Sequence, residues 1–247
     1  MGRERRISGW RRIVAGALLC LGHPSAAAED REAKEEPSRI LFSSVEMGAS
    51  TFVGSGFKWR LDGPSDTTGI VLMGTAGAGT LRDRQIREDG LVRLDHLSSQ
   101  GSLLLGYQRM TGRGVWAVLA GAEADLRQPL VGGALMERID PAFGVRLQAE
   151  LWRHPTDRTL VTGTLIAGTA GPHLWARASW GYRVWQDVHL GPEAAISLER
   201  DHREARLGLH ATGLRIGRFN LRLSGGLLLQ DPGEPAGYAA LTTYFKL

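Results

Sequence analysis

Residues 238–247, YAALTTYFKL, alternate between two kinds of side chain. The odd-numbered positions are mostly apolar: Ala239, Leu241, Thr243, Phe245 and Leu247. The even-numbered positions mix tyrosine, threonine, alanine and lysine. A period of two is that of a β-strand, because successive side chains of a strand point to opposite faces of the sheet. The segment is therefore predicted to form a strand with one apolar face and one mixed face.

The same alternation recurs in the segments before it. It is present in RFNLRLSGGLLLQ (218–230), EARLGLHATG (204–213) and VHLGPEAAISLE (188–199). In LWARASWGYRV (174–184) and FGVRLQAELWR (143–153) the polar face carries several charged side chains. Charges that face a lumen explain this pattern better than charges that face a dry core, since a buried unpaired charge is costly.

Turn signals between the alternating runs divide the chain into twelve predicted strands. Their approximate ranges are 39–47, 51–61, 67–80, 97–109, 114–127, 143–153, 159–170, 174–184, 188–199, 204–215, 219–229 and 238–247. Longer polar loops are expected at 81–96 and 128–142. An even number of strands of about ten residues, each with one apolar face, is typical of transmembrane barrels. The predicted fold is all-β: a closed antiparallel up-and-down β-barrel of about twelve strands, of outer-membrane type, closed by pairing of 238–247 with 39–47.

The glycine-rich stretch GIVLMGTAGAGT (69–80) raises a different possibility, a phosphate-binding turn. Both common nucleotide motifs need fixed glycine spacings at the start of a helix. Gly74, Gly77 and Gly79 fit neither spacing, and no lysine follows. We expect them to be structural, because glycine relieves crowding where a barrel wall bends or where a neighbouring aromatic ring lies over the backbone.

The N-terminal segment has the layout of a secretory signal peptide. It combines five arginines, the short apolar run IVAGALLCLG (13–22), and small residues Ala26 and Ala28 ahead of Glu29. We expect a signal peptide at 1–28, a flexible charged lead-in at 29–38 and a single barrel domain at 39–247.

The predicted leader also accounts for the basic character of the chain. It holds five of the 30 basic residues and one of the 26 acidic residues, so the remainder carries equal numbers of each. A neutral mature chain gives no reason to expect a nucleic-acid partner. The single cysteine, Cys20, lies in the leader too, which excludes disulfides and thiolate chemistry from the predicted exported protein.

A series of short motifs follows in a characteristic order. They are LFSSVEMGASTFVGSGFKW (41–59), LLLGYQ (103–108), AGAEAD (120–125), LWRHP (151–155), WGYR (180–183), LGPEAAIS (190–197), RLGLHATG (206–213), LRLSGG (221–226) and GYAALTTYFKL (237–247). In this order and spacing the chain resembles the cellulose biosynthesis protein BcsS family of Gram-negative bacteria, over residues 41–247. The resemblance implies a secreted, barrel-like protein of the outer membrane, with no established catalytic residue and no cofactor.

The expected function is that of a non-enzymatic outer-membrane barrel that assists cellulose biosynthesis, export or anchoring. Its expected partners are outer-membrane lipid and either cellulose or other cellulose-secretion components. Two alternatives stay open. One is a lipid- or glycan-modifying enzyme built on a barrel, and the other is a soluble periplasmic barrel that binds a ligand.

Neither a metal site nor a catalytic set is predicted from residue spacing. The seven histidines form no H-E-x-x-H or His-x-His motif. His189, Glu193 and Ser197 share one strand face, but strand positions four apart are separated by about 13 Å, so a triad would need partners from other strands. A glycosidase pair drawn from Glu123, Glu150 and Glu193 is a further alternative.

The candidate functional residues lie on the polar face. We expect a lumen network of mutually neutralising groups: Glu150, Arg146, Arg177, Arg183, Glu193, Arg206 and His210. Outward positions toward lipid are expected for Leu207, Leu209, Leu221, Leu223, Leu241 and Phe245, with Arg222 inward. Trp152 and Trp175 are candidates for stacking on sugar rings, although tryptophans in barrels also anchor the protein at the membrane interfaces, as Trp180 and Trp185 could.

One register can be predicted from parity. If 188–199 and 204–215 form a hairpin with their polar faces together, opposed residue numbers sum to 401 or 403. The first sets Gly191 against His210, and the second sets Glu193 against His210. We favour 403, because Arg200-Asp201 is not a preferred two-residue turn and because 403 gives both polar groups a partner.

Overall fold

The computed structural model describes residues 39–247, apart from 88–89, 132–133, 136–138, 200–201 and 232. Within the strands, the side chains of 81–95 and 131–138 also fall outside the description. The predicted signal peptide and the predicted lead-in both lie outside the described residues. No helix capable of crossing a bilayer is found in the described part of the chain.

The described chain is built of β-strands. Their bounds are β1 Arg39–Met47, β2 Thr51–Arg60, β3 Gly69–Arg87, β4 Gly90–Thr111, β5 Gly114–Val131, β6 Ala134–Leu135, β7 Asp140–Thr156, β8 Thr159–Gly168, β9 His173–Trp185, β10 Val188–Glu199, β11 Arg203–Ile216, β12 Phe219–Asp231 and β13 Ala236–Lys246. All pairings are antiparallel, and each long strand pairs with the next along the chain. The two-residue β6 pairs only with β5, so the wall has twelve strands.

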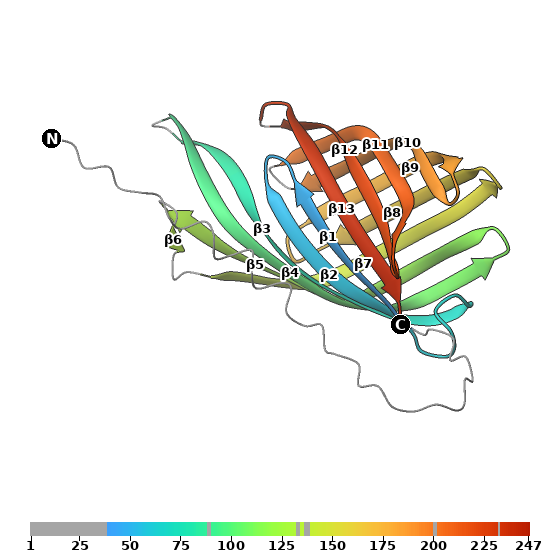
Figure 1. Cartoon of the computed structure of the whole chain (residues 1–247). Coiled ribbons are helices and arrows are strands. Elements are labelled where there is room, and N and C mark those ends of the chain that lie inside the picture. The colour runs from blue at the N-terminus through green and yellow to red at the C-terminus, as the bar shows by residue number, and fades with distance from the viewer. Residues whose placement is uncertain (1–38, 88–89, 132–133, 136–138, 200–201, 232) are drawn as a thin grey trace, which may run out of the picture. The chain divides into compact units, whose positions relative to one another are not determined.

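The first and last strands close the barrel (Figure 1). β1 pairs with β13 over eight residue pairs, from Ile40 opposite Lys246 to Met47 opposite Ala239. Closure leaves no unpaired edge, and each backbone group in the lipid needs such a partner. The predicted closed antiparallel barrel, including the pairing of its two ends, is confirmed.

The longer loops predicted at 81–96 and 128–142 are mostly strand. β3 and β4 continue as a hairpin until Arg87 pairs with Gly90, and β5 and β7 also run on past the predicted boundaries. Figure 1 shows β3, β4 and β5 projecting beyond the neighbouring strands. The loop prediction was wrong because it required a one-sided apolar pattern. A hairpin that extends past the bilayer needs backbone pairing but no apolar face.

The outward side chains form an apolar belt. Leu207 and Leu209 are 59% and 60% exposed, and Leu223 and Leu241 are exposed as well. The alternate positions are inside, where His210 is 1% and Arg222 5% exposed. An apolar outer surface around a polar interior is the arrangement of a transmembrane β-barrel, in which lipid replaces water on the outside.

One side of the interior is apolar. Val71, Met73, Leu104, Ala117 and Leu119 form a buried cluster on β3, β4 and β5, with Phe42 of β1 packed against it. The lumen is therefore divided between this apolar packing and a polar network on the remaining strands.

The favoured register of the β10–β11 hairpin was wrong. Gly191 lies opposite His210 and Glu193 opposite Gly208, so opposed numbers sum to 401. The 403 register would be favoured if a lumen charge took its partner from the adjacent strand. Glu193 is instead paired with Arg222 on β12, two strands away, because inward side chains converge toward the barrel axis.

Gly74, Gly77 and Gly79 of β3 lie beneath aromatic rings of β2. A Cβ at Gly77 would lie 2.6 Å from the Phe52 ring, and one at Gly79 would lie 2.7 Å from it. On the outer side, a Cβ at Gly74 would collide with the ring of Phe57. These glycines thus make room for rings that lie flat on the wall, as predicted.

This packing predicts a destabilised Gly77→Ala variant. The added methyl would meet both the Phe52 ring and, at 2.9 Å, the carbonyl oxygen of Val53. We expect the free energy of unfolding to fall by about 1–3 kcal/mol, the usual cost of overpacking. Ala78→Val, at the next, outward-facing position, is the control and should change it by less than about 0.5 kcal/mol. Urea titration of the barrel in micelles measures both, and equal values for the two variants would contradict the assignment.

Candidate functional site

An ion pair lies inside the polar half of the lumen. Arg222 of β12 donates to Glu193 of β10, and the two side chains are only 6% and 4% exposed. Arg222 also donates to the hydroxyl oxygen of Thr162 on β8 at 3.2 Å, and Ser224 donates to Glu193 at 3.3 Å. Thr162 in turn is 2.7 Å from the Ser179 hydroxyl. The pair thus ties together β8, β9, β10 and β12.

His210 occupies a recess made by two glycines. It lies opposite Gly191, and a Cβ at Gly181 would be 3.0 Å from its ring. Nε2 is 3.3 Å from the Trp180 carbonyl oxygen, so in the neutral ring Nε2 donates there. Nδ1 then accepts from the Thr212 hydroxyl at 2.8 Å. Both ring nitrogens are satisfied without Glu193.

A second group of side chains spans the lumen from β7. Arg146 donates to Gln148 at 2.8 Å, and Gln148 donates to Glu150 at 2.8 Å. Glu150 also accepts from Lys58 of β2 at 2.8 Å. Since β2 and β7 are four strands apart in the ring, this contact crosses the interior.

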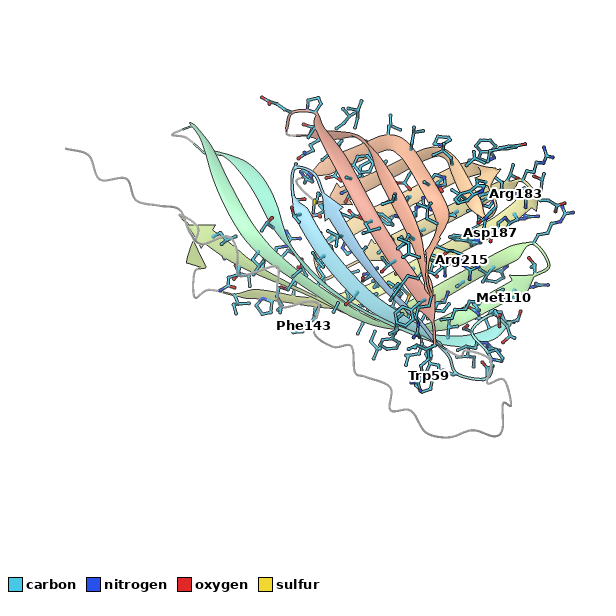
Figure 2. The ribbon with its side chains drawn as sticks, viewed as in Figure 1. Trp59, Met110, Phe143, Arg183, Asp187 and Arg215 are labelled. Atoms are coloured by element: carbon cyan, nitrogen blue, oxygen red, sulfur yellow. The ribbon has the colours of Figure 1, made fainter. Side chains whose placement is uncertain are left out.

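The end of the barrel at which β1 begins and β13 ends, which we call the terminal end, is also crowded. Trp152 of β7 and Tyr244 of β13 come from strands six positions apart and meet with ring centroids 6.4 Å apart. The 61–68 connection is held at this end by Gln108, which donates to the carbonyl oxygens of Ser65 and Thr67, each at 2.8 Å. In Figure 2 the labelled Trp59, Met110, Arg183, Asp187 and Arg215 mark this end.

A cavity of about 370 Å³ lies at the opposite end of the lumen. Its rim includes Ala49, Gly171 and His202, which lie in the connections after β1, β8 and β10. Its walls include Trp175, Phe42, Phe52 and several charged side chains. A cavity of this volume is at the low end of the range for small-molecule sites, about 300–1,000 Å³.

Two clusters of charged side chains lie around the cavity. In one, Arg206 donates to Glu46 at 2.6 Å and to Glu204 at 2.5 Å. In the other, Arg127 donates to Asp125 at 2.9 Å and to Glu199 at 3.4 Å.

Most residues of the predicted lumen network point inward. Arg146 and Glu150 belong to the β7 group, Glu193 to the buried ion pair, and Arg206 to the cavity rim. His210 sits in its glycine recess, and the Arg177 guanidinium lies 5.4 Å from the ring of Trp175. Arg183 is the exception, because it is exposed near the last residue of β9, at the terminal end of the barrel.

The four candidate tryptophans differ in exposure. Trp152 and Trp175 are directed into the lumen, Trp180 is 46% exposed on the outer face, and Trp185, the last residue of β9, is 66% exposed. The exposed pair suits interfacial anchoring. The inner pair occupies two different places, since Trp152 meets Tyr244 and Trp175 lines the cavity.

His189, Glu193 and Ser197 do not assemble into a triad. Nδ1 of His189 bonds to the Asp187 carbonyl oxygen at 2.9 Å, Glu193 is bonded to Arg222, and Ser197 lines the cavity. Within the described ranges, no group of three or more histidine, cysteine, aspartate or glutamate side chains could hold a metal ion.

Sequence reasoning missed several partners in these clusters. Lys58, Glu46 and Arg127 each bond a side chain from a non-adjacent strand, and Asp125 bonds Arg127 of its own strand. All four stand on the inward parity of their own strands, which was a usable signal. Their partners could not be predicted, because parity gives the face of a residue but not which strand it reaches.

The buried ion pair predicts an unequal response to two substitutions. Glu193→Ala leaves the Arg222 charge buried and unpaired, so the free energy of unfolding should fall by about 3–5 kcal/mol. Lys246→Ala removes a pair with Asp66 whose side chains are about half exposed, and should cost less than about 1 kcal/mol. Urea unfolding in micelles compares the two, and a small, equal loss would show that Arg222 is solvated.

Comparisons with known proteins bear on identity. Among solved structures, the chain is similar to the KdgM porin (7% identity, TM-score 0.45), covering 84% of this chain and 99% of that one. It is also similar to the translocator domain of the autotransporter NalP from Neisseria meningitidis (12% identity, TM-score 0.44), covering 85% and 88%. No curated protein matches the chain.

The closed, even-stranded barrel with its apolar belt is the architecture of bacterial outer-membrane proteins, and it places the protein in that membrane. A family model described as cellulose biosynthesis protein BcsS matches residues 40–247, almost all of the barrel. The chain therefore belongs to the cellulose biosynthesis protein BcsS family.

Proposed function

We propose that the protein is a non-enzymatic outer-membrane barrel that retains cellulose at the cell surface and does not conduct it. The observation that carries the proposal is the contact between opposite walls of the lumen. Trp152 and Tyr244 meet from strands six positions apart, and Lys58 reaches Glu150 across four. A polymer passing through would have to break both contacts.

The two ends of the barrel differ in a way that supports one orientation in the membrane. Four connections at the terminal end have only two residues: 112–113, 157–158, 186–187 and 217–218. At the other end β3, β4 and β5 project well past their neighbours. Outer-membrane barrels have short turns in the periplasm and longer extensions outside. The cavity end then faces the exterior, where secreted cellulose is found.

An enzymatic role has less support. A general acid or base needs a carboxyl group that is free to exchange a proton with substrate. Glu150 and Glu193 are instead bonded to Lys58 and Arg222. Ser197 reaches the cavity, but no hydrogen bond to a histidine activates it among the described contacts. These pairings favour a structural role for the two carboxylates, in which the ion pairs stiffen the barrel wall, over a catalytic one.

The test is a deletion strain in which cellulose is measured separately in washed cells and in the medium. Loss of a retaining protein should move cellulose from the cells to the medium with little change in the total. The wild-type gene and the Ser197→Ala variant should both restore cell-bound cellulose.

Two outcomes would contradict the proposal. Cellulose trapped in the periplasm of the deletion strain would indicate a role in export. Failure of Ser197→Ala to restore retention, with normal amounts of folded barrel in the membrane and an unchanged affinity for a soluble cello-oligosaccharide, would indicate catalysis.

A further inference from the structure

Aromatic rings lie on facing walls of the cavity. Trp175 is on β9 and Phe52 on β2, and these strands are six positions apart in the ring, which sets them on opposite sides. Phe42, on the neighbouring strand β1, also lines the cavity, four residues along from the position opposite Phe52. Flat apolar rings on two sides suit a ligand that has apolar faces, such as the C–H faces of a sugar ring.

Hydrogen-bonding groups lie on the walls between the aromatic rings. The cluster of Arg206 with Glu46 and Glu204 lies on one side, and the cluster of Arg127 with Asp125 and Glu199 on another. A guanidinium has five N–H donors and a carboxylate about four acceptor sites, so both clusters keep unused capacity. Hydroxyl groups, which donate and accept, can use both kinds.

The charge balance of the cavity favours a neutral ligand. Five carboxylates and three guanidinium groups line it. The excess of negative charge disfavours an anion. A cation would gain little, because Glu46, Glu204, Asp125 and Glu199 are already paired with arginine and Glu123 accepts from the Ala170 backbone N–H at 2.9 Å.

The inner end of the cavity is closed. Arg146 lies there, bonded to Gln148, and the group of Gln148, Glu150 and Lys58 fills the lumen beyond it. Nε of Arg146 is buried and has no hydrogen-bond partner. A donor left unpaired beside a cavity is costly unless a ligand or a water accepts from it. A blind cavity admits the end of a chain and not its middle.

From these features we infer that the cavity binds the end of a neutral glucan chain, with Trp175 stacked on a sugar ring and Arg146 donating to a hydroxyl or ring oxygen. The inference rests on the proposed retaining function and gives it a site. A bound chain end would hold cellulose to the outer face of the barrel without any passage through it.

The test is calorimetric titration of the full, micelle-embedded barrel with cellotetraose. We expect saturable binding that Trp175→Ala weakens about tenfold or more, since truncating an aromatic anchor typically costs that much. Trp180→Ala is the matched control on the same strand. The Trp180 side chain is on the outer face and 46% exposed, so the affinity of this variant for cellotetraose should stay within about twofold of wild type.

Two further arms make the result decisive. Arg146→Gln should weaken cellotetraose binding while the protein keeps the heat-dependent gel migration of a folded barrel, and an anionic oligogalacturonate should bind more weakly than cellotetraose.

Absence of cellotetraose binding, or equal affinity in Trp175→Ala and wild type, would overturn the inference. If cellulose retention still depends on the gene in that case, the proposed function stands without this site. If cellotetraose binds as expected but deletion leaves retention unchanged, the proposed function fails instead.

Discussion

The backbone pairing between β1 and β13 is the constraint on which the rest of the structure depends. In a bilayer each N–H and C=O group needs a partner from the protein, and a sheet can meet that demand only by closing on itself. Closure of twelve strands curves the wall strongly. Curvature then accounts for the glycines of β3, which allow rings of β2 to lie flat on both faces of the wall.

Closure also decides what the interior can do. Side chains that point inward converge on the axis, so each can reach beyond its nearest neighbours. Arg222 therefore bonds with Glu193 two strands away, and Trp152 meets Tyr244 from the opposite wall. The lumen is divided by these contacts into a filled portion and a blind cavity. The filled portion favours the proposed retaining role over conduction through the lumen.

Much of the fold could be predicted from the sequence because parity is a local property. The alternation in 238–247 predicted the strand and its two faces, and the need to close the barrel predicted its pairing with 39–47. Strand length outside the bilayer could not be predicted in the same way, because hairpins in water need no apolar face and the stretch 81–96 has none. The partners of lumen charges were also beyond reach. The mistaken pairing of Glu193 with His210 came from treating the wall as flat, where only adjacent strands interact.

The central claim is that the lumen is closed, and its electrical conductance tests this most directly. Purified barrel is inserted into a planar lipid bilayer in concentrated salt, with an open porin as the positive control for insertion. The cross-lumen contacts of Trp152 with Tyr244 and of Lys58 with Glu150 predict no stable open-channel steps. Steady conductance steps comparable to those of the open porin would contradict the account.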